Sequence, residues 1–357
     1  MKKLILLLAI PLILIACSKK EDKQIQNQNL DYKGVELLGA GATFPYPLYS
    51  KLFDTFYNIE NVKVNYQSIG SGGGIRQLLN KTVHFGATDA FMTDEEISNA
   101  PKPIIHIPTC LGADVITYNL PNNPQLSLTP DLLADIFLGK ITNWNDPRIK
   151  KINPDIKLPN LHIVVVHRSD GSGTTFIFSD YLSKVSQEWE KKVGRGKSLN
   201  WPTGLGGKGN EGVSGLVKQT PGSIAYVELI YAIGNGMPVA AIQNKSGNFI
   251  MPSIESVSQS ANIELPEDTR ISITNTDAPQ GYPISSFTWL IIYEELNILK
   301  INEQQANALI KLLWWMTHDG QKLLEPLHYA PLPDAAVKNV EKLLKKIKFN
   351  GNLILNK

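Results

Sequence analysis

Three short loops of this chain share one design, which constrains its fold more than any other feature does. They are GAGATF (39–44), SIGSGGG (68–74) and RSDGSGTT (168–175). Each is rich in glycine and hydroxyl side chains, and each stands between an expected strand and an expected helix. Strands and helices that alternate along a chain are typical of the α/β class, so the sequence predicts an α/β fold.

The chemistry of these loops favours the binding of an anion without a metal. The first turn of a helix leaves backbone N–H groups unpaired and carries a partial positive charge. Glycine lets an anion approach the backbone, and serine and threonine add hydroxyl donors. One such loop is often only a turn. Three in the same context indicate a ligand site, because ligands of open α/β sheets gather at the carboxyl ends of strands.

The apolar pattern divides the chain into two regions. In the first, strands at 35–39, 62–68 and 83–89 alternate with helices at 46–58 and 75–82. The apolar segments 104–108 and 112–119 bring this region to an end near residue 117, and a second region begins with a helix at 129–137 and contains the strand before the third loop. The second region is followed by a long apolar strand at 282–295 and two amphipathic helices, with apolar faces formed by Leu309, Leu312, Leu313 and Met316, and by Val337, Val340, Leu344 and Ile347.

Composition fits a globular protein and argues against a nucleic-acid partner. The chain has 357 residues, of which 43% are hydrophobic and 19% charged, enough for two domains with apolar cores. The formal net charge is +2, and Lys2 and Lys3 account for that excess. Because no broad basic field remains, recognition of an anion has to be local. The lysines of the last helix are best explained as a solvated surface.

The N-terminus has the form of an export signal. MKK is followed by an apolar stretch too short to span a membrane comfortably, and this stretch ends in LIAC, whose last residue is Cys17. The ending resembles a bacterial lipoprotein processing box, which implies removal of residues 1–16 and lipidation of Cys17. An ordinary signal peptide or an uncleaved anchor is the alternative. Residues 17–33 are polar and are expected to form a flexible tether.

The second cysteine is expected to be structural. Cys110 has no partner for an intrachain disulfide once Cys17 is lipidated. Its apolar surroundings, IPTCLGADV, predict a buried thiol rather than a nucleophile.

Motifs of other site classes fail on their spacing. GRGKS (194–198) ends like a Walker A motif, but Lys191 stands where a glycine is needed. No G-x-S-x-G elbow surrounds Ser71 or Ser172. His162 and His167 are five apart on an expected strand, so they face opposite ways and make a poor zinc pair. The sequence therefore predicts no metal, no cofactor and no enzymatic activity.

Six segments, in order, resemble the phosphate-binding proteins of bacterial phosphate ABC transporters. They are LGAGATFPYPLYSKLFDTF, VNYQSIGSGGGIRQLL, VHFGATDAFMTDEE, LGKITNWND, VVHRSDGSGTTFIFSDYLSKV and WPTGLGGKGNEGV. The match covers most of 37–330 and rests on several independent loops.

This resemblance implies the type II periplasmic-binding-protein fold, with two α/β domains, two interdomain crossovers and the ligand in the cleft. The crossovers are placed near 117 and 284. Domain I would comprise 34–117 and 284–357, and domain II would comprise 118–283. The arrangement agrees with a second region inserted within a first.

The resemblance also implies the ligand contacts. The family's phosphate-binding residues correspond here to Thr43, Phe44, Ser71, Asp89, Arg168, Ser172, Gly173 and Thr174. Asp170 is expected to pair with Arg168 and orient it. Two departures from the family pattern stand nearby, Gly72 in place of a frequent serine and the segment FMTDEE after Asp89.

Asp89 is the residue expected to select the ligand. Phosphate near neutral pH still has a proton to donate, whereas sulfate has none. A buried carboxylate accepts that proton in a hydrogen bond but repels sulfate and leaves itself unpaired. Arg168 would supply charge-assisted hydrogen bonds, and the hydroxyls would supply neutral ones.

Helix capping is the alternative explanation for several of these residues. Asp89 could cap a helix in AFMTDEE, and Ser71, Ser172 and Thr174 could cap their own helices. Asn210 and Glu211 open a helix after a glycine-rich loop, and capping alone explains them, so they stand outside the predicted site.

The resemblance implies a monomeric carrier that binds phosphate tightly outside the cytoplasm, closes its cleft and delivers the anion to membrane permease subunits. It would be periplasmic or on the cell surface, held to the membrane by lipidated Cys17. One alternative is a secreted phosphatase or esterase using Ser172 beside His167. Another is a binding protein for a different oxyanion, although sulfate, molybdate and tungstate lack the proton that Asp89 would accept.

Overall fold

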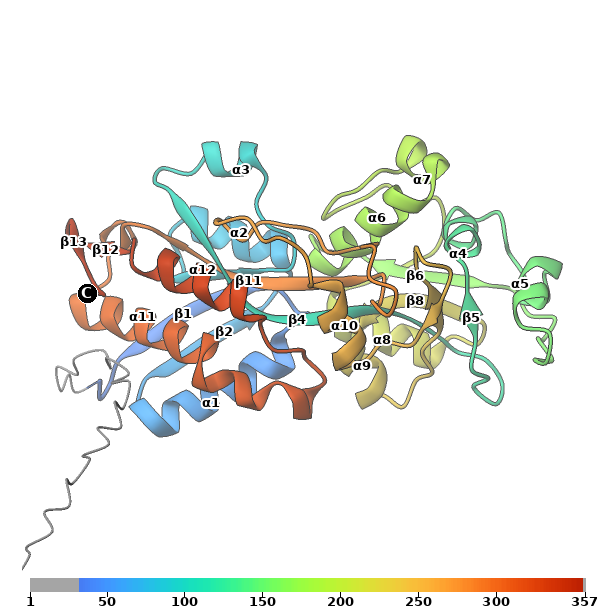
Figure 1. Cartoon of the computed structure of the whole chain (residues 1–357), viewed down its shortest axis with the longest axis horizontal. Helices are drawn as coiled ribbons and strands as arrows, with labels where there is room; N and C mark the ends of the chain where they lie inside the picture. The colour runs from blue at the N-terminus through green and yellow to red at the C-terminus, as the bar shows by residue number, and fades with distance from the viewer. Residues whose placement is uncertain (1–31, 356–357) are drawn as a thin grey trace, which may run out of the picture. The chain divides into compact units, whose positions relative to one another are not determined.

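The computed structural model describes residues 32–355, in which eight strands form one large sheet. From edge to edge their order is β2, β1, β3, β11, β4, β8, β6 and β7. Their bounds are β1 Glu36–Gly41, β2 Lys63–Ser68, β3 Phe85–Thr88, β4 Ile104–Tyr118, β6 Val164–Arg168, β7 Leu205–Gly207, β8 Ser223–Glu228 and β11 Ser285–Tyr293. With helices on both sides of this sheet, the predicted α/β class is confirmed (Figure 1).

Parallel strands form the two flanks of the sheet, and antiparallel strands form its centre. The first flank is β2, β1 and β3, and the second flank is β8, β6 and β7. β11 and β4 join them, pairing antiparallel with β3, with each other and with β8. Figure 1 shows β4 and β11 running between the elements around α2 and those around α6. The carboxyl ends of both parallel flanks are thereby brought to one central place.

Helices connect most of these strands. The α-helices are α1 Tyr46–Glu60, α2 Ser71–Leu79, α3 Asp94–Ser98, α4 Pro130–Phe137, α5 Pro147–Ile152, α6 Gly173–Val185, α7 Gln187–Lys192, α8 Gly209–Gln219, α9 Leu229–Gly234, α10 Ile254–Ser260, α11 Glu303–Thr317 and α12 Asp334–Leu344. The 3-10 helices are η1 Leu296–Leu299, η2 Asp319–Leu323 and η3 Glu325–Leu327. Two small sheets pair β10 Phe249–Ile250, β9 Ala241–Gln243 and β5 Ser127–Leu128, and β12 Lys348–Phe349 with β13 Asn352–Leu353.

The apolar faces predicted for the last two helices pack into the core, and so does one face of the first helix. Leu48, Leu52 and Phe56 of α1 are fully buried. In α11 the same holds for the four predicted residues, and in the last segment all but the half-buried Val337 are buried. Cys110 is also fully buried, as its apolar surroundings predicted.

One strand replaces two predicted segments. The segments 104–108 and 112–119 lie in the continuous strand β4. Nearly every residue of this strand is buried, because other strands flank it and helices cover it. A strand buried on both faces reads as an unbroken apolar run, without the alternation that would reveal its length.

Helix α2 begins earlier than predicted. The sequence predicted a loop through Gly74 and a helix from Ile75, whereas the helix starts at Ser71. A Cβ at Gly74 would come within 2.6 Å of the Ala40 carbonyl oxygen and the Gly41 Cα. The glycines therefore serve close packing of a helix on a strand rather than a loop.

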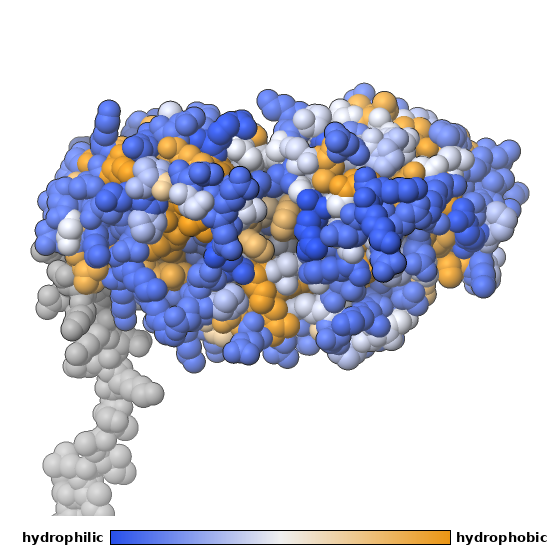
Figure 2. Space-filling view, turned by 90° about the horizontal axis from the view of Figure 1, so that it is seen from above, coloured by the Kyte–Doolittle hydropathy of each residue, from blue (hydrophilic) through white to orange (hydrophobic). Residues whose placement is uncertain are grey.

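The surface is mostly hydrophilic. On the face in Figure 2 the apolar residues form separate patches among polar ones. Within 32–355, no helix is long and apolar enough to cross a membrane. Cys17 and the predicted signal and tether up to residue 31 lie outside the described residues.

Candidate functional site

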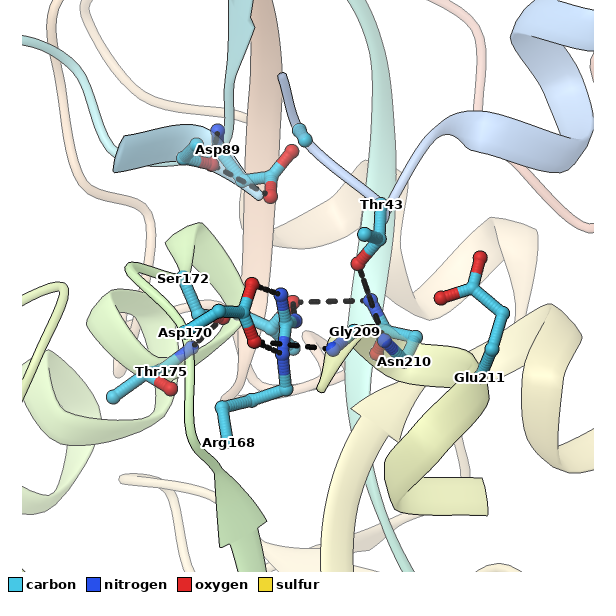
Figure 3. Close-up of polar contacts among 12 residues, drawn as sticks. Thr43, Asp89, Arg168, Asp170, Ser172, Thr175, Gly209, Asn210 and Glu211 are labelled. Atoms are coloured by element: carbon cyan, nitrogen blue, oxygen red, sulfur yellow. Dashed lines mark hydrogen bonds and ion pairs between the residues drawn. The ribbon is translucent and has the colours of Figure 1, made fainter. Parts of the chain in front are cut away.

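The two flanks of the sheet deliver their loops to one place. Thr43 and Asp89 lie in the loops after β1 and β3, Ser71 begins α2 after β2, and Arg168 ends β6. Figure 3 shows Asp89 and Thr43 on one side and Arg168, Asp170 and Ser172 on the other. The eight predicted binding residues are all at least nine-tenths buried where they are brought together. This is the geometry expected where the carboxyl ends of parallel strands face each other.

Arg168 is held by Asp170, as the sequence predicted. Its Nε donates to Asp170 Oδ1 at 2.7 Å and its Nη2 donates to Asp170 Oδ2 at 2.6 Å, which makes a bidentate pair. Its Nη1 donates to Thr174 Oγ1 at 3.1 Å. The guanidinium side chain is only 1% exposed, so its charge acts in a region from which water is excluded.

Asp170 is in turn fixed from a third element. Its Oδ1 also accepts a hydrogen bond from the backbone N–H of Gly209, the first residue of α8, at 3.0 Å. Burial raises the pKa of Asp170, but the hydrogen bond and charge of Arg168 outweigh it and lower the pKa below its ordinary value. Asp170 therefore stays ionised and neutralises Arg168 rather than meeting a ligand.

Asp89 has only neutral partners. Thr288 of β11 donates to its Oδ1 at 2.6 Å, and Ser71 donates to its Oδ2 at 3.3 Å. A Cβ at Gly173 would lie 2.5 Å from Asp89 Oδ2, so the first turn of α6 packs directly against this carboxyl. Burial raises the pKa of Asp89 to about 7, against the lowering effects of Thr288 and the Arg168 charge. The group is poised to share a proton near neutral pH.

The capping alternatives are decided residue by residue. Ser172 does cap α6, because its Oγ accepts from the Thr175 N–H at 3.0 Å. Asp89 caps no helix: α3 begins at Asp94 and is capped by Thr93. Ser71 and Thr174 lie within the first turns of α2 and α6 and are not caps.

Several backbone donors at the site are unused. The N–H groups of Phe44, Ser71, Gly173 and Thr174 make no hydrogen bond to any described residue. Three of them belong to the first turns of α2 and α6, where the helix dipole is positive. Together with Arg168 they form a set of donors that a small oxyanion can satisfy.

The loops from the two flanks touch each other. The Gly72 N–H donates to the Gly171 carbonyl at 2.9 Å, and a Cβ at Gly70 would collide with Asp170 Oδ2. Further out, Lys197 forms an ion pair with Glu96 at 2.7 Å. The carbonyl of Lys197 accepts from the Ser172 N–H at 2.8 Å, so this ion pair connects α3 directly to the start of α6.

Sequence reasoning missed three residues of the site. Asn210, assigned only to capping, is fully buried and donates from its Nδ2 to Thr43 Oγ1 at 2.7 Å (Figure 3). Thr288 holds Asp89 from β11, and Tyr231 donates to the Thr43 carbonyl at 2.6 Å. Only Asn210 had a local signal, as a polar residue directly after a glycine-rich loop. The other two lie more than 180 residues from their partners.

Two further acids are buried close to the site. Asp114 of β4 and Glu228 of β8 are paired across the sheet and fully buried. Three of their four carboxyl oxygens have no hydrogen-bond partner among the described residues. Burial raises the pKa of each well above its ordinary value, and the charge of Glu228 raises that of Asp114 further, which favours their neutral forms. The pair therefore adds little negative charge beneath the anion donors.

Ser172 and His167, the pair of the hydrolase alternative, are not joined as nucleophile and base. The His167 ring stacks on Trp201, and its Nδ1 contacts the Arg168 carbonyl. No hydrogen bond joins His167 to Ser172. Within 32–355, no cluster of three or more metal-ligating side chains occurs. A surface hollow of about 490 Å³ lies beside α12 and contains none of the predicted site residues.

Comparison with known proteins gives concordant matches. Residues 21–318 match the model of the PBP superfamily domain. The phosphate-binding protein PstS of Xylella fastidiosa is 44% identical over 314 residues, which are 87% of this chain and 85% of that protein. PstS of Methanocaldococcus jannaschii is 41% identical over 364 residues, covering 93% of this chain and 92% of that protein.

A solved structure shares the fold at low sequence identity. The crystal structure of a phosphate-binding protein from Stenotrophomonas maltophilia superposes with a TM-score of 0.68 at 17% identity. The match covers 86% of this chain and 93% of that chain. It supports the two-domain architecture predicted from the sequence.

Proposed function

Because this chain belongs to the PBP superfamily and, within it, to the PstS phosphate-binding proteins, we propose that it binds inorganic phosphate and delivers it to the permease of an ABC transporter. The observation that carries this proposal is the buried carboxyl of Asp89, whose pKa is about 7 and which lies beside the donors of the site. A protonated oxyanion can donate to Asp89 while its other oxygens accept from Arg168, the hydroxyls and the unused N–H groups.

Titration calorimetry tests this directly. A chain that begins at residue 18 keeps every described residue and is titrated with phosphate and, separately, with sulfate. We expect saturable heat with phosphate and at least a hundredfold weaker binding of sulfate, because sulfate leaves the buried Asp89 carboxyl unpaired. Absence of heat with phosphate, or equal affinity for both ions, would contradict the proposal. We also expect no release of phosphate from a chromogenic ester.

We infer that two domains close on the ligand. Domain I comprises 34–117 with 284–357, and domain II comprises 118–283. In support, β4 pairs with β11 up to Ala113 and with β8 from Asp114 onward, so one strand serves both regions. Donors from both flanks would then favour the closed form by contacts available only there. Small-angle scattering should show a smaller radius of gyration with phosphate than without it.

The location follows from the export signal. We propose that the mature chain is monomeric, begins at Cys17 and is held by lipid on the outer side of a membrane, in the periplasm or on the cell surface. The sequence LIAC supports this proposal. Mass spectrometry of the mature N-terminus tests it, since a lipidated cysteine and a free N-terminus differ in mass by acyl chains.

A further inference from the structure

The orientation of the Asn210 side chain is fixed by a group that can only donate. The backbone N–H of Glu228 donates to Asn210 Oδ1 at 3.0 Å. The atom that faces this N–H must be the amide oxygen, so Nδ2 must face the other way. Nδ2 there approaches Thr43 Oγ1 at 2.7 Å and Thr174 Oγ1 at 3.3 Å (Figure 3).

Each of the two threonine hydroxyl oxygens already accepts two hydrogen bonds from N–H groups, which can only donate. Thr43 Oγ1 accepts from Nδ2 and also from the backbone N–H of Asn210 at 3.2 Å. Thr174 Oγ1 accepts from Nδ2 and from Arg168 Nη1 at 3.1 Å. A hydroxyl has two acceptor lone pairs and one hydrogen. Neither hydrogen is donated to any group within residues 32–355, although both side chains are buried.

We propose that Asn210 is a positioning residue that makes the hydroxyls of Thr43 and Thr174 obligate donors and so leaves Asp89 to accept the proton of the bound oxyanion. The proposal rests on the proposed function, since it takes phosphate as the ligand. An unrestrained hydroxyl can either donate to a phosphate oxygen or accept from a phosphate hydroxyl. With Asn210 in place, neither threonine hydroxyl can accept a hydrogen bond from a phosphate hydroxyl. The ligand proton is therefore directed to Asp89.

A purely structural role for Asn210 has to be separated from this one, because its Oδ1 also ties α8 to β8. Ser214 provides the matched control. Its Oγ donates to the Asn210 carbonyl at 2.8 Å from the next turn of α8, and it forms no hydrogen bond with either threonine. Ser214→Ala removes a buried hydrogen bond from the same helix without changing either hydroxyl.

The test is a double-mutant cycle in phosphate affinity. Asn210→Leu should weaken phosphate binding about 10- to 100-fold, the range for hydrogen bonds to a charged group. Ser214→Ala should stay within about twofold of the unmodified chain. In a Thr43→Val/Thr174→Val background, Asn210→Leu should cause less than about a threefold further loss, because the hydroxyls through which it acts are gone.

Asn210→Asp covers the case in which the leucine variant does not fold. Its carboxylate keeps an acceptor for the Glu228 N–H but accepts from the threonine hydroxyls and turns their hydrogens away from the ligand. Asn210→Asp should therefore lower phosphate affinity more in the unmodified chain than in the Thr43→Val/Thr174→Val background. Repulsion between its carboxylate and phosphate acts equally in both. Equal losses in the two backgrounds would overturn the inference. Failure of the unmodified chain to bind phosphate would instead overturn the proposed function.

Discussion

The two flanks of the sheet bring opposite electrostatic designs to one site. On the second flank, Arg168 and Asp170 form a bidentate pair in which both groups remain charged and each neutralises the other. On the first flank, Asp89 has only hydroxyl partners, and its pKa rises to about 7. Charge is therefore compensated on the second flank, whereas on the first flank the carboxyl of Asp89 can share a proton with the ligand. Recognition of an anion and selection among anions are thus assigned to different flanks.

The largest effect on phosphate affinity is expected from a change in the charged pair of the second flank. Arg168→Lys should weaken phosphate binding by at least about 100-fold, because a lysine cannot make the bidentate pair with Asp170 and contact Thr174 together. Calorimetry measures the loss. Arg148→Lys is the matched control, since Arg148 is half exposed in its pairs with Asp135 and Asp146. Unaltered affinity in the Arg168 variant would show that binding does not depend on the hydrogen-bond geometry of the guanidinium.

The next largest effect is expected on the selection between anions, through the carboxyl of Asp89. Asp89→Asn should reduce the preference for phosphate over sulfate by about tenfold or more, since a buried amide neither repels sulfate nor needs a ligand proton. Affinities for both ions are compared in the same buffer. A preference left unchanged would remove Asp89 from the selective role.

The same residue has a consequence for stability without ligand. The pKa of Asp89 is raised in the folded state, so the folded protein holds this proton more tightly than the unfolded chain does. Stability from this group is therefore full below pH 4 and is lost as pH rises towards 7, at about 1.4 kcal/mol per pKa unit. Asp89→Asn should flatten the fall of Tm across that window. A Tm profile parallel to that of the unmodified chain would contradict the assigned shift.

A smaller effect is expected from the ion pair that connects the two flanks. Glu96→Gln should speed phosphate release and weaken binding about 1.4- to fivefold, since partly exposed pairs contribute about 0.2 to 1 kcal/mol. Stopped-flow release at low and high salt measures it, and the difference between the two chains should shrink at high salt. Glu36→Gln, which breaks an exposed pair with Lys63 within the first flank, should leave release unchanged.

The smallest effect on binding is expected at the N-terminus. Cys17→Ala should leave phosphate affinity unchanged while abolishing the attachment of lipid to the chain. Labelling of cells with a tagged fatty acid measures the attachment. A variant that still takes up the label would contradict lipidation at Cys17.

Local patterns were sufficient for the class and for most of the site. The loops after β1, β2 and β6 were found from glycine and hydroxyl content alone, because such loops leave a local mark on the sequence, whereas Asp89 after β3 came from the family resemblance. Residue roles came from family resemblance. Ser172, for which helix capping was the alternative to phosphate binding, is a helix cap in the structure. The start of α2 was misplaced because a glycine run indicates a loop by propensity, whereas close packing on β1 holds it in a helix.

The sequence was sufficient to predict the alternation of strands and helices, the apolar faces that pack and the loops that present donors. All of these features depend on residues that are close together in the sequence. Only the tertiary structure decided that Thr288 would hold Asp89 and that Asn210 would face Thr43 and Thr174. These contacts join residues 36 to 199 positions apart. The direction of each hydrogen bond depends on which donor lies beside each buried acceptor. That pairing arises only when the sheet brings its two flanks together.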